Sequence, residues 1–182
     1  MRKLYTYAGV AASLLLIVFG VTAAVVGLNG RADVRTELAR ERIVGTEDST
    51  IPGQQVDTGA EAREFAAVMR KHTLEATGGL TYAQMGRFLD ESGKPTNDES
   101  KAAVENGKPV ENGLRQMWVT ETALTTALNT AYFAESTATF VAAMGGMMLL
   151  VGIGFLVLTV RLLAPATGTA RVRSQRAVPA AG

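Results

Sequence analysis

Two uncharged stretches decide the fold of this chain: LYTYAGVAASLLLIVFGVTAAVVGL at residues 4–28 and STATFVAAMGGMMLLVGIGFLVLTV at residues 136–160. Each runs for 25 residues without an Asp, Glu, Lys, Arg or His. A helix rises about 1.5 Å per residue, so each stretch would extend over about 37 Å as a helix. That length exceeds the hydrocarbon core of a bilayer, which is about 30 Å thick. We therefore predict two membrane-spanning helices, and the lipid bilayer as the first partner.

The segment between the two stretches, residues 29–135, is polar and acidic. It holds 12 Lys/Arg against all 17 Asp/Glu of the chain, a net charge of −5, whereas the whole chain has a net charge of +1. A net-negative segment without a basic cluster argues against a nucleic acid partner. Its length allows one small domain. The chain has no cysteine, so neither a disulfide framework nor a thiolate metal site is expected.

Basic residues predict the orientation of the spans. Arg161, Arg171, Arg173 and Arg176 follow the second stretch, whereas only Arg115 lies within about 20 residues before it. The first stretch has basic residues on both sides, so it gives only weak evidence about which end is cytoplasmic. Because cytoplasmic flanks carry an excess of Lys and Arg, we expect a two-pass protein of the plasma membrane with both termini in the cytoplasm.

The predicted organisation has five parts. They are a cytoplasmic N-terminus at residues 1–3, a first transmembrane helix at 4–28, an extracytoplasmic domain at 29–135, a second transmembrane helix at 136–160 and a basic, disordered cytoplasmic tail at 161–182. The first stretch is longer than the apolar region of a cleaved signal peptide, about 7–15 residues. An uncleaved anchor is therefore favoured, and cleavage near Ala23 and Ala24 is the alternative.

The insert itself is predicted to be all-helical, since no stretch alternates with period two for long enough to be a strand. The first helix should continue past the membrane and end near residues 43–45, before a loop at 46–58. A second helix should cover residues 60–76 and stop at Gly78-Gly79. Thr81 should cap a short helix that carries Phe88 and Leu89, and residues 98–105 should form one or two helical turns. Asn112 should cap a last helix that runs from Gly113 into the second span.

Two membrane helices that both continue outward should form an antiparallel helical stalk. If Leu28 and Ala138 lie at similar depth, Arg31 faces Glu135. Glu135 and Glu121 both fall on the apolar stripe of the last helix, where a buried carboxylate needs a partner. We expect Arg31 to pair with Glu135, and Arg40 or Arg42 to pair with Glu121. The alternative is that both glutamates reach water at the edge of the stripe.

Two further structural residues follow from position and size. Trp118 lies about 20 residues, or about 30 Å, before the second span, too far out for an interfacial aromatic belt. It is predicted to anchor the core of the outer domain. Small residues repeat every four positions in both spans, a spacing that allows close helix packing. These residues are Ala8/Ala12 and Gly9/Ser13 in the first span and Ala138/Ala142/Gly146 in the second.

His72 is the only histidine of the chain, and with Glu75 it forms an H-x-x-E pair on one helical face. This pair is a weak candidate for half of a metal or acid–base site. The alternative is a packed histidine whose ring meets a neighbouring carboxylate. One histidine without cysteine supports neither a common zinc set nor a 2-His-1-carboxylate iron site. No catalytic residue, metal or cofactor is therefore predicted.

Three segments carry a resemblance to known proteins: HTLEATGG at residues 72–79, TYAQMGRFL at 81–89 and WVTETALTTALNTAYFAE at 118–135. From Met1 to about Leu163 the chain resembles an uncharacterised group of actinobacterial two-span membrane proteins, often labelled aromatic ring-opening dioxygenases. The resemblance implies the two-span topology and no site residues. Ring cleavage by a non-haem iron would need more histidine than this chain has.

The sequence leaves three functions open. The first is a non-catalytic membrane protein of a bacterial cell envelope, an accessory or scaffold subunit whose helical outer domain docks a protein partner or a second copy. The second is a sensor-like module that binds a small molecule, which a pocket near Trp118, Tyr82 and His72 would favour. The third, less favoured, is a metal-dependent oxygenase.

Overall fold

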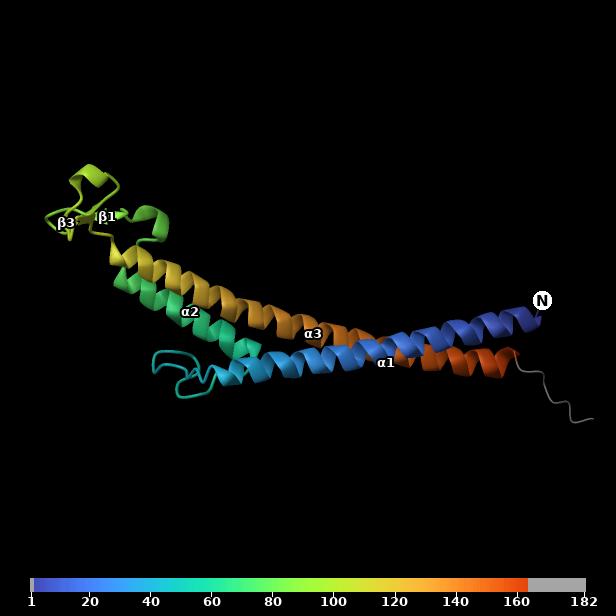
Figure 1. Cartoon of the computed structure of the whole chain (residues 1–182). Helices are drawn as coiled ribbons and strands as arrows, with labels where there is room; N and C mark the ends of the chain where they lie inside the picture. Colours follow the sequence, from blue (N-terminus) through green and yellow to red (C-terminus); the bar gives the residue numbers. More distant parts are fainter. Residues whose placement is uncertain (1, 164–182) are drawn as a thin grey trace, which may run out of the picture. The chain divides into compact units, whose positions relative to one another are not determined.

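The computed structural model describes residues 2–163 of the chain. Within this range the chain forms three α-helices, two 3₁₀ turns and four two-residue strands (Figure 1). The helices are α1 (Arg2–Arg40), α2 (Gly59–Ala76) and α3 (Gly113–Leu163), and the 3₁₀ turns are η1 (Tyr82–Gln84) and η2 (Glu99–Lys101). Most of the predicted cytoplasmic tail, including Arg171, Arg173 and Arg176, lies outside the described residues.

Both α1 and α3 contain a segment that is long and apolar enough to cross a membrane. In the most apolar window of each helix, only 11% of the residues are buried within the chain. Large side chains such as Leu15, Phe19, Leu150 and Phe155 are therefore exposed. Apolar side chains that point outward over such a length match the lipid environment that the uncharged runs predict.

The chain divides into two compact units, one of residues 1–20 with 147–182 and one of residues 21–146. Small residues mark the helix contacts of the first unit. A Cβ atom on Gly9 would lie 2.9 Å from the Thr159 side chain, and one on Gly152 would lie 2.8 Å from Ile17. Ser13 is only 1% exposed, and its hydroxyl donates to the Gly9 carbonyl at 2.8 Å. The α1 and α3 segments of this unit thus approach closely at Gly9 and Ser13, a predicted small-residue pair.

The second unit, residues 21–146, has a similar close contact. A Cβ atom on Gly27 would lie 2.6 Å from the Ala138 carbonyl oxygen and 2.8 Å from Ala142 Cα, so only glycine fits there. A Cβ atom on Gly30 would lie 3.6 Å from Ala138. Further along, Arg31 and Arg35 reach Glu135. Because contacts on α3 move back along the chain as contacts on α1 move forward, these two segments run in opposite directions.

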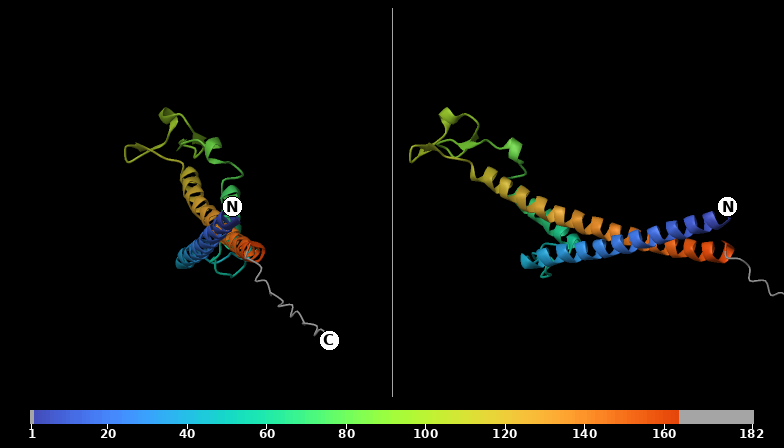
Figure 2. Two further views of the ribbon diagram at one scale, coloured as in Figure 1. Left: turned by 90° about the vertical axis from the view of Figure 1, so that its right-hand side faces the viewer. Right: turned by 45° about the vertical axis from the view of Figure 1, so that its right-hand side comes forward.

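Helix α2 covers nearly the predicted residues 60–76 and ends at the predicted Gly78-Gly79 stop, whereas its N-cap was not predicted. Thr58 and Glu61 form a capping box, in which the Thr58 hydroxyl accepts from the Glu61 N–H and the Glu61 carboxylate accepts from the Thr58 N–H. Gly78 and Gly79 have φ values of 63° and 83°, the left-handed conformation that closes a helix C-terminus. The Gly79 N–H donates to the Leu74 carbonyl at 2.7 Å. In Figure 1 and in the right-hand view of Figure 2, α2 lies beside the first half of α3.

The start of α3 is also capped as predicted. The Asn112 side-chain oxygen accepts from the Leu114 N–H at 3.1 Å, and its backbone carbonyl accepts from the Arg115 N–H at 3.0 Å. By contrast, α1 ends at Arg40, a few residues before the predicted end at 43–45. The loop that follows is closed by an isolated bridge between Val44 and Gln55.

The prediction that the insert is wholly helical is wrong between α2 and α3. This part holds two antiparallel hairpins, β1 (Phe88–Leu89) with β2 (Pro95–Thr96), and β3 (Val104–Glu105) with β4 (Lys108–Pro109). The short helix expected after Thr81 is only the η1 turn, and Phe88 and Leu89 enter a strand instead. The helical turns expected at residues 98–105 are reduced to η2. Strands of two residues are too short to show an alternating pattern.

Candidate docking groove

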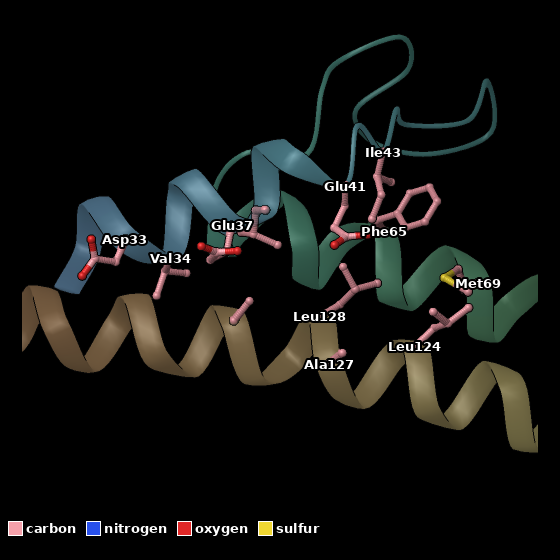
Figure 3. Close-up of a pocket in the computed structure, with 12 residues that line it drawn as sticks. Asp33, Val34, Glu37, Glu41, Ile43, Phe65, Met69, Leu124, Ala127 and Leu128 are labelled. Atoms are coloured by element: carbon pink, nitrogen blue, oxygen red, sulfur yellow. The ribbon is translucent and has the colours of Figure 1, made fainter. Parts of the chain in front are cut away.

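An apolar groove of about 640 Å³ lies among the three helices of the second unit (Figure 3). Each helix contributes apolar side chains at helical spacing, so the apolar stripes that build the core also line the groove. Figure 3 shows Val34 pointing from α1 toward α3, and Leu128 rising from α3. The apolar lining consists of Val34 and Leu38 on α1, Ile43 after it, Phe65 and Met69 on α2, and Leu124, Ala127, Leu128 and Ala131 on α3.

The groove lies over the packed core of this unit. One buried cluster joins all three helices with the loop after α1, and its members are Leu38, Val56, Ala62, Ala66 and Leu128. Val56 is fully buried. Partly buried side chains, among them Phe65 and Met69, pack on this cluster and line the groove. The inner surface of the groove is therefore built on side chains that the core already holds in place.

One edge of the groove is acidic. Asp33 and Glu37 lie one turn apart on α1, and Glu41 follows directly after the helix. All three are exposed, and they complete the twelve residues of the lining. No Lys, Arg or His is among these twelve. Glu37 accepts a hydrogen bond from Arg40 Nη1 at 2.6 Å, with both side chains about two-thirds exposed. A surface pair of this kind contributes only about 0–1 kcal/mol. Asp33 and Glu41 have no ion pair within residues 2–163.

Glu135, one turn along α3 from the groove residue Ala131, ties the three helices together. Its Oε2 accepts from the Gly59 N–H at the start of α2 at 2.5 Å. Its Oε1 accepts from Arg31 Nε at 3.0 Å and from Arg35 Nε at 2.7 Å, both on α1. The predicted Arg31–Glu135 pair is thus present. Sequence reasoning missed Arg35 and Gly59, although Arg35 lies four residues after Arg31 and therefore on the same helical face.

The environment of Glu135 keeps its carboxyl group ionised. Burial disfavours the charged form, since the residue is only 8% exposed. The Gly59 N–H and the guanidinium groups of Arg35 and Arg31 outweigh that effect, so the pKa of Glu135 lies below its ordinary value. Gly59 is required at this contact, because a Cβ atom would lie 2.7 Å from Tyr132 Cα.

His72 and Glu75 contact different side chains. His72 Nε2 lies 2.8 Å from Asp48 Oδ2, in the loop after α1, and Lys71 Nζ donates to the same oxygen at 3.0 Å. Hydrogen bonds from His72 and Lys71 hold the pKa of Asp48 well below its usual range. Glu75 instead lies 3.9 Å from Lys71 Nζ. The two members of the H-x-x-E motif therefore have different partners. Within residues 2–163, no group of three His, Asp or Glu side chains is placed to hold a metal ion.

Both predicted environments of Glu121, an arginine partner and open water, are wrong. It is 3% exposed, so it does not reach water, and neither Arg40 nor Arg42 pairs with it. Its Oε2 accepts from Thr122 Oγ1 at 3.3 Å, while Oε1 is buried without a hydrogen-bond partner among the described residues. The reason is geometric: Leu128 packs in one cluster with Leu38, near the end of α1, and Glu121 lies two further turns away.

Trp118 and Gly146 have different outcomes. Trp118 is buried as predicted, its indole N–H donates to the Leu80 carbonyl at 2.8 Å, and the Arg70 guanidinium lies 5.1 Å from its ring centroid. It therefore holds the segment after α2 against α3. At Gly146, an added Cβ atom would meet nothing within 4 Å in the described chain. Gly146 thus makes no close helix contact of the kind found at Gly27.

A second pocket, of about 380 Å³, lies at the start of α3 and includes Tyr82. Neither Trp118 nor His72 lines it, so this pocket does not join the three residues that the sequence groups together. Its lining is polar and includes two arginines, Arg87 and Arg115.

Comparisons of the chain with protein-family models, with curated proteins and with solved structures find no match. The resemblance to the actinobacterial two-span proteins therefore stays a prediction. The function has to be inferred from the side chains of the groove and of the helices that carry it.

Proposed function

We propose that this protein is a non-catalytic, two-span subunit of a bacterial plasma membrane whose outer region docks a partner membrane protein. In this proposal both termini are cytoplasmic, residues 29–135 are extracytoplasmic, and the outer parts of α1 and α3 form an antiparallel stalk. The exposed apolar side chains of the two uncharged runs support the two spans. The arginines after residue 160 support the orientation.

The acid-edged apolar groove carries this proposal. Exposed apolar surface outside a membrane is costly unless a partner covers it, and a groove between helices is a common receptor for an amphipathic helix. The lining offers no hydroxyl, thiol or imidazole group, so it contains no Ser, Thr, Cys or His for nucleophilic chemistry. The groove is therefore better suited to bind a segment of another protein than to carry out a reaction on it.

The acidic edge defines the partner. Asp33 and Glu37 lie one turn, about 6 Å, apart on α1, and Glu41 lies one residue past its end, so the three carboxylates match about two turns of a second helix. Three carboxylates over that length attract a helix with Lys or Arg along one flank and apolar residues along the face that enters the groove. Leu28 ends the first uncharged run, so Asp33 lies only about 8 Å beyond the predicted span. We therefore assign the occupant as a cationic amphipathic helix next to a membrane span of a partner protein.

The chain's own basic segment is excluded as the occupant under this topology. Arg161 and the arginines after it follow the second span, on the opposite side of the membrane from the groove. The arginines of α2 are engaged elsewhere, with Arg63 over Tyr132 at 4.8 Å and Arg70 over Trp118 at 5.1 Å. A foreign helix thus remains the better match for the carboxylates.

Site-specific photocrosslinking in native membranes tests the proposal. A photoreactive amino acid replaces Ala127, an exposed groove residue, and mass spectrometry identifies the crosslinked peptide. We expect a peptide rich in Lys or Arg that lies within about ten residues of a predicted span. The triple variant Asp33→Asn, Glu37→Gln, Glu41→Gln should reduce that crosslink at least tenfold. The matched control Glu91→Gln, Glu99→Gln, Glu105→Gln changes the charge equally at exposed residues away from the groove and should leave it intact.

Three results would overturn the proposed partner. One is a crosslink only to a second copy of this chain, and another is a crosslink only to lipid. The third is a crosslink that both triple variants weaken equally, because it would show a response to net charge rather than to the groove edge. Ala127→Trp, which fills the groove without changing charge, should abolish the crosslink made from a photoreactive residue at Leu124.

A further inference from the structure

We propose that the polar pocket at the start of α3 binds a small molecule through an oxyanion, a carboxylate or phosphate group. This proposal is independent of the docking groove, because the two share no lining residue. The pocket has a volume of about 380 Å³ and lies between the segment after α2 and the first two turns of α3. It is lined by Tyr82, Arg87, Glu111, Asn112, Arg115, Gln116 and Val119.

Two unpaired guanidinium groups point to the ligand. Within residues 2–163, neither Arg87 nor Arg115 forms an ion pair, although both line the same pocket. Arg115 Cζ lies 4.0 Å from the centroid of the Tyr82 ring, so its guanidinium group stacks on an aromatic face. Stacking leaves the N–H groups in the guanidinium plane free to donate. Arg115 Nε is buried and has no hydrogen-bond partner among the described residues.

Hydrogen bonds fix the backbone that carries Arg87 at the start of α3 before any ligand binds. The Asn112 N–H donates to the Arg87 carbonyl at 2.9 Å, and the Arg87 N–H donates to Asn97 Oδ1 at 3.0 Å. The Asn112 side-chain amide donates to the Gly86 carbonyl at 2.9 Å. Asn112 therefore caps α3 and fixes the segment that carries Arg87 against Arg115. A site with prearranged donors loses less conformational entropy on binding.

The charge of the pocket favours one anionic group. The lining contains two guanidinium groups and one carboxylate, that of Glu111, which forms no ion pair among the described residues. The excess positive charge suits a single carboxylate or phosphate, whose two oxygens match the fork of an arginine side chain. Glu111 disfavours a second negative group close to the first. We therefore expect a ligand with one anionic head and a neutral or cationic remainder near Glu111.

Isothermal titration calorimetry on the full chain in detergent tests the site. Inorganic phosphate and glycine are the probes, one for each oxyanion source, at constant pH and ionic strength. We expect one of them to bind saturably at about one per chain. Arg87→Gln and Arg115→Gln should each weaken that binding at least tenfold. Arg63→Gln removes an arginine that also lies over a tyrosine ring, but outside the pocket, and should leave binding within twofold.

The two probes distinguish a phosphate head from a carboxylate head. Saturable binding of phosphate assigns a phosphate head, and that of glycine assigns a carboxylate head with a cationic remainder. If Arg115→Gln fails to fold, Arg115→Lys keeps the charge but loses the planar fork, and it should still weaken binding at least tenfold. Either of two results would overturn the proposal. One is no saturable binding of either probe up to about 10 mM. The other is a loss of binding in Arg63→Gln as large as that in Arg87→Gln or Arg115→Gln.

Discussion

The carboxylate of Glu135 should stabilise the three-helix region more than any exposed ion pair of the chain. The change Glu135→Ala removes the acceptor for Arg31 Nε, Arg35 Nε and the Gly59 N–H. It also leaves the Gly59 N–H in a buried position without a partner. The start of α2 would then lose its hydrogen bond to α3, and α3 would lose its ion pairs with α1.

The cost can be estimated from the three contacts. A hydrogen bond to a charged group contributes about 1.5–3 kcal/mol, and the buried Gly59 N–H belongs to this class. The side chains of Arg31 and Arg35 are 42% and 41% exposed, so solvent screening reduces each ion pair to about 0.5–1 kcal/mol. Together they give about 2.5–5 kcal/mol for Glu135→Ala, with a midpoint of about 3–4 kcal/mol. Glu135→Gln keeps the shape and one acceptor, and should cost about 1–2 kcal/mol.

Hydrogen exchange measured by mass spectrometry is the suitable assay, because it reports the opening free energy of individual segments. Peptides that cover the start of α2 should exchange faster in Glu135→Ala by a factor corresponding to 3–4 kcal/mol, about 10²–10³. The control is Glu37→Ala, which removes a carboxylate 68% exposed and paired with Arg40. It should change the opening free energy by about 0–1 kcal/mol.

A single result would refute this reasoning. If α2 peptides exchange equally fast in Glu135→Ala and in Glu37→Ala, then the buried carboxylate is worth no more than an exposed one. The contacts at Gly59, Arg31 and Arg35 would then not stabilise the junction of the three helices.

Three further predictions concern pH, helix contact and burial. Because the pKa of Glu135 is lowered in the folded state, its contribution to stability is complete above about pH 4.5 and is lost as the pH falls through its folded-state pKa. When thermal stability is measured against pH, Glu135→Gln should therefore show a smaller loss of stability in this acidic range. Gly27→Ala should destabilise the chain by about 1–3 kcal/mol, since its Cβ would overlap Ala138. Gly146→Ala meets open space and should gain up to about 1 kcal/mol from helix propensity. Thermal melts measure both, and a higher melting midpoint in both variants would show that Gly27 makes no close contact. Glu121→Met should raise stability by about 1–3 kcal/mol, because it replaces a buried carboxylate that has an unpartnered oxygen; chemical denaturation of the two proteins checks the sign.

Local patterns predicted the long helices and their caps. The uncharged runs at residues 4–28 and 136–160 lie within α1 and α3, and the Gly78-Gly79 stop and the Asn112 cap lie where the sequence indicates. These signals work because each depends on residues within one helical turn. The two hairpins were missed because each strand has only two residues, so no periodic pattern marks it.

The candidate site was predicted only in part. A register argument found the Arg31–Glu135 pair, because both residues lie on long helices whose alignment follows from the ends of the spans. The same argument failed at Glu121, because it extended α1 beyond Arg40. The place of α2 could not be read from the sequence, and so neither the Gly59 contact nor the groove was predicted. His72 likewise pairs with Asp48, 24 residues away, and not with its neighbour Glu75.

The sequence by itself determined two apolar helices, an acidic segment between them, the end of α2 and the start of α3, because hydrophobic runs, net charge and capping residues act locally. Only the tertiary structure decided which carboxylates are buried, which are paired and which lie along an apolar groove. Those properties depend on where α2 and the loop after α1 pack against α3. Packing brings together residues such as Gly59 and Glu135, 76 positions apart, whose contact no local pattern encodes.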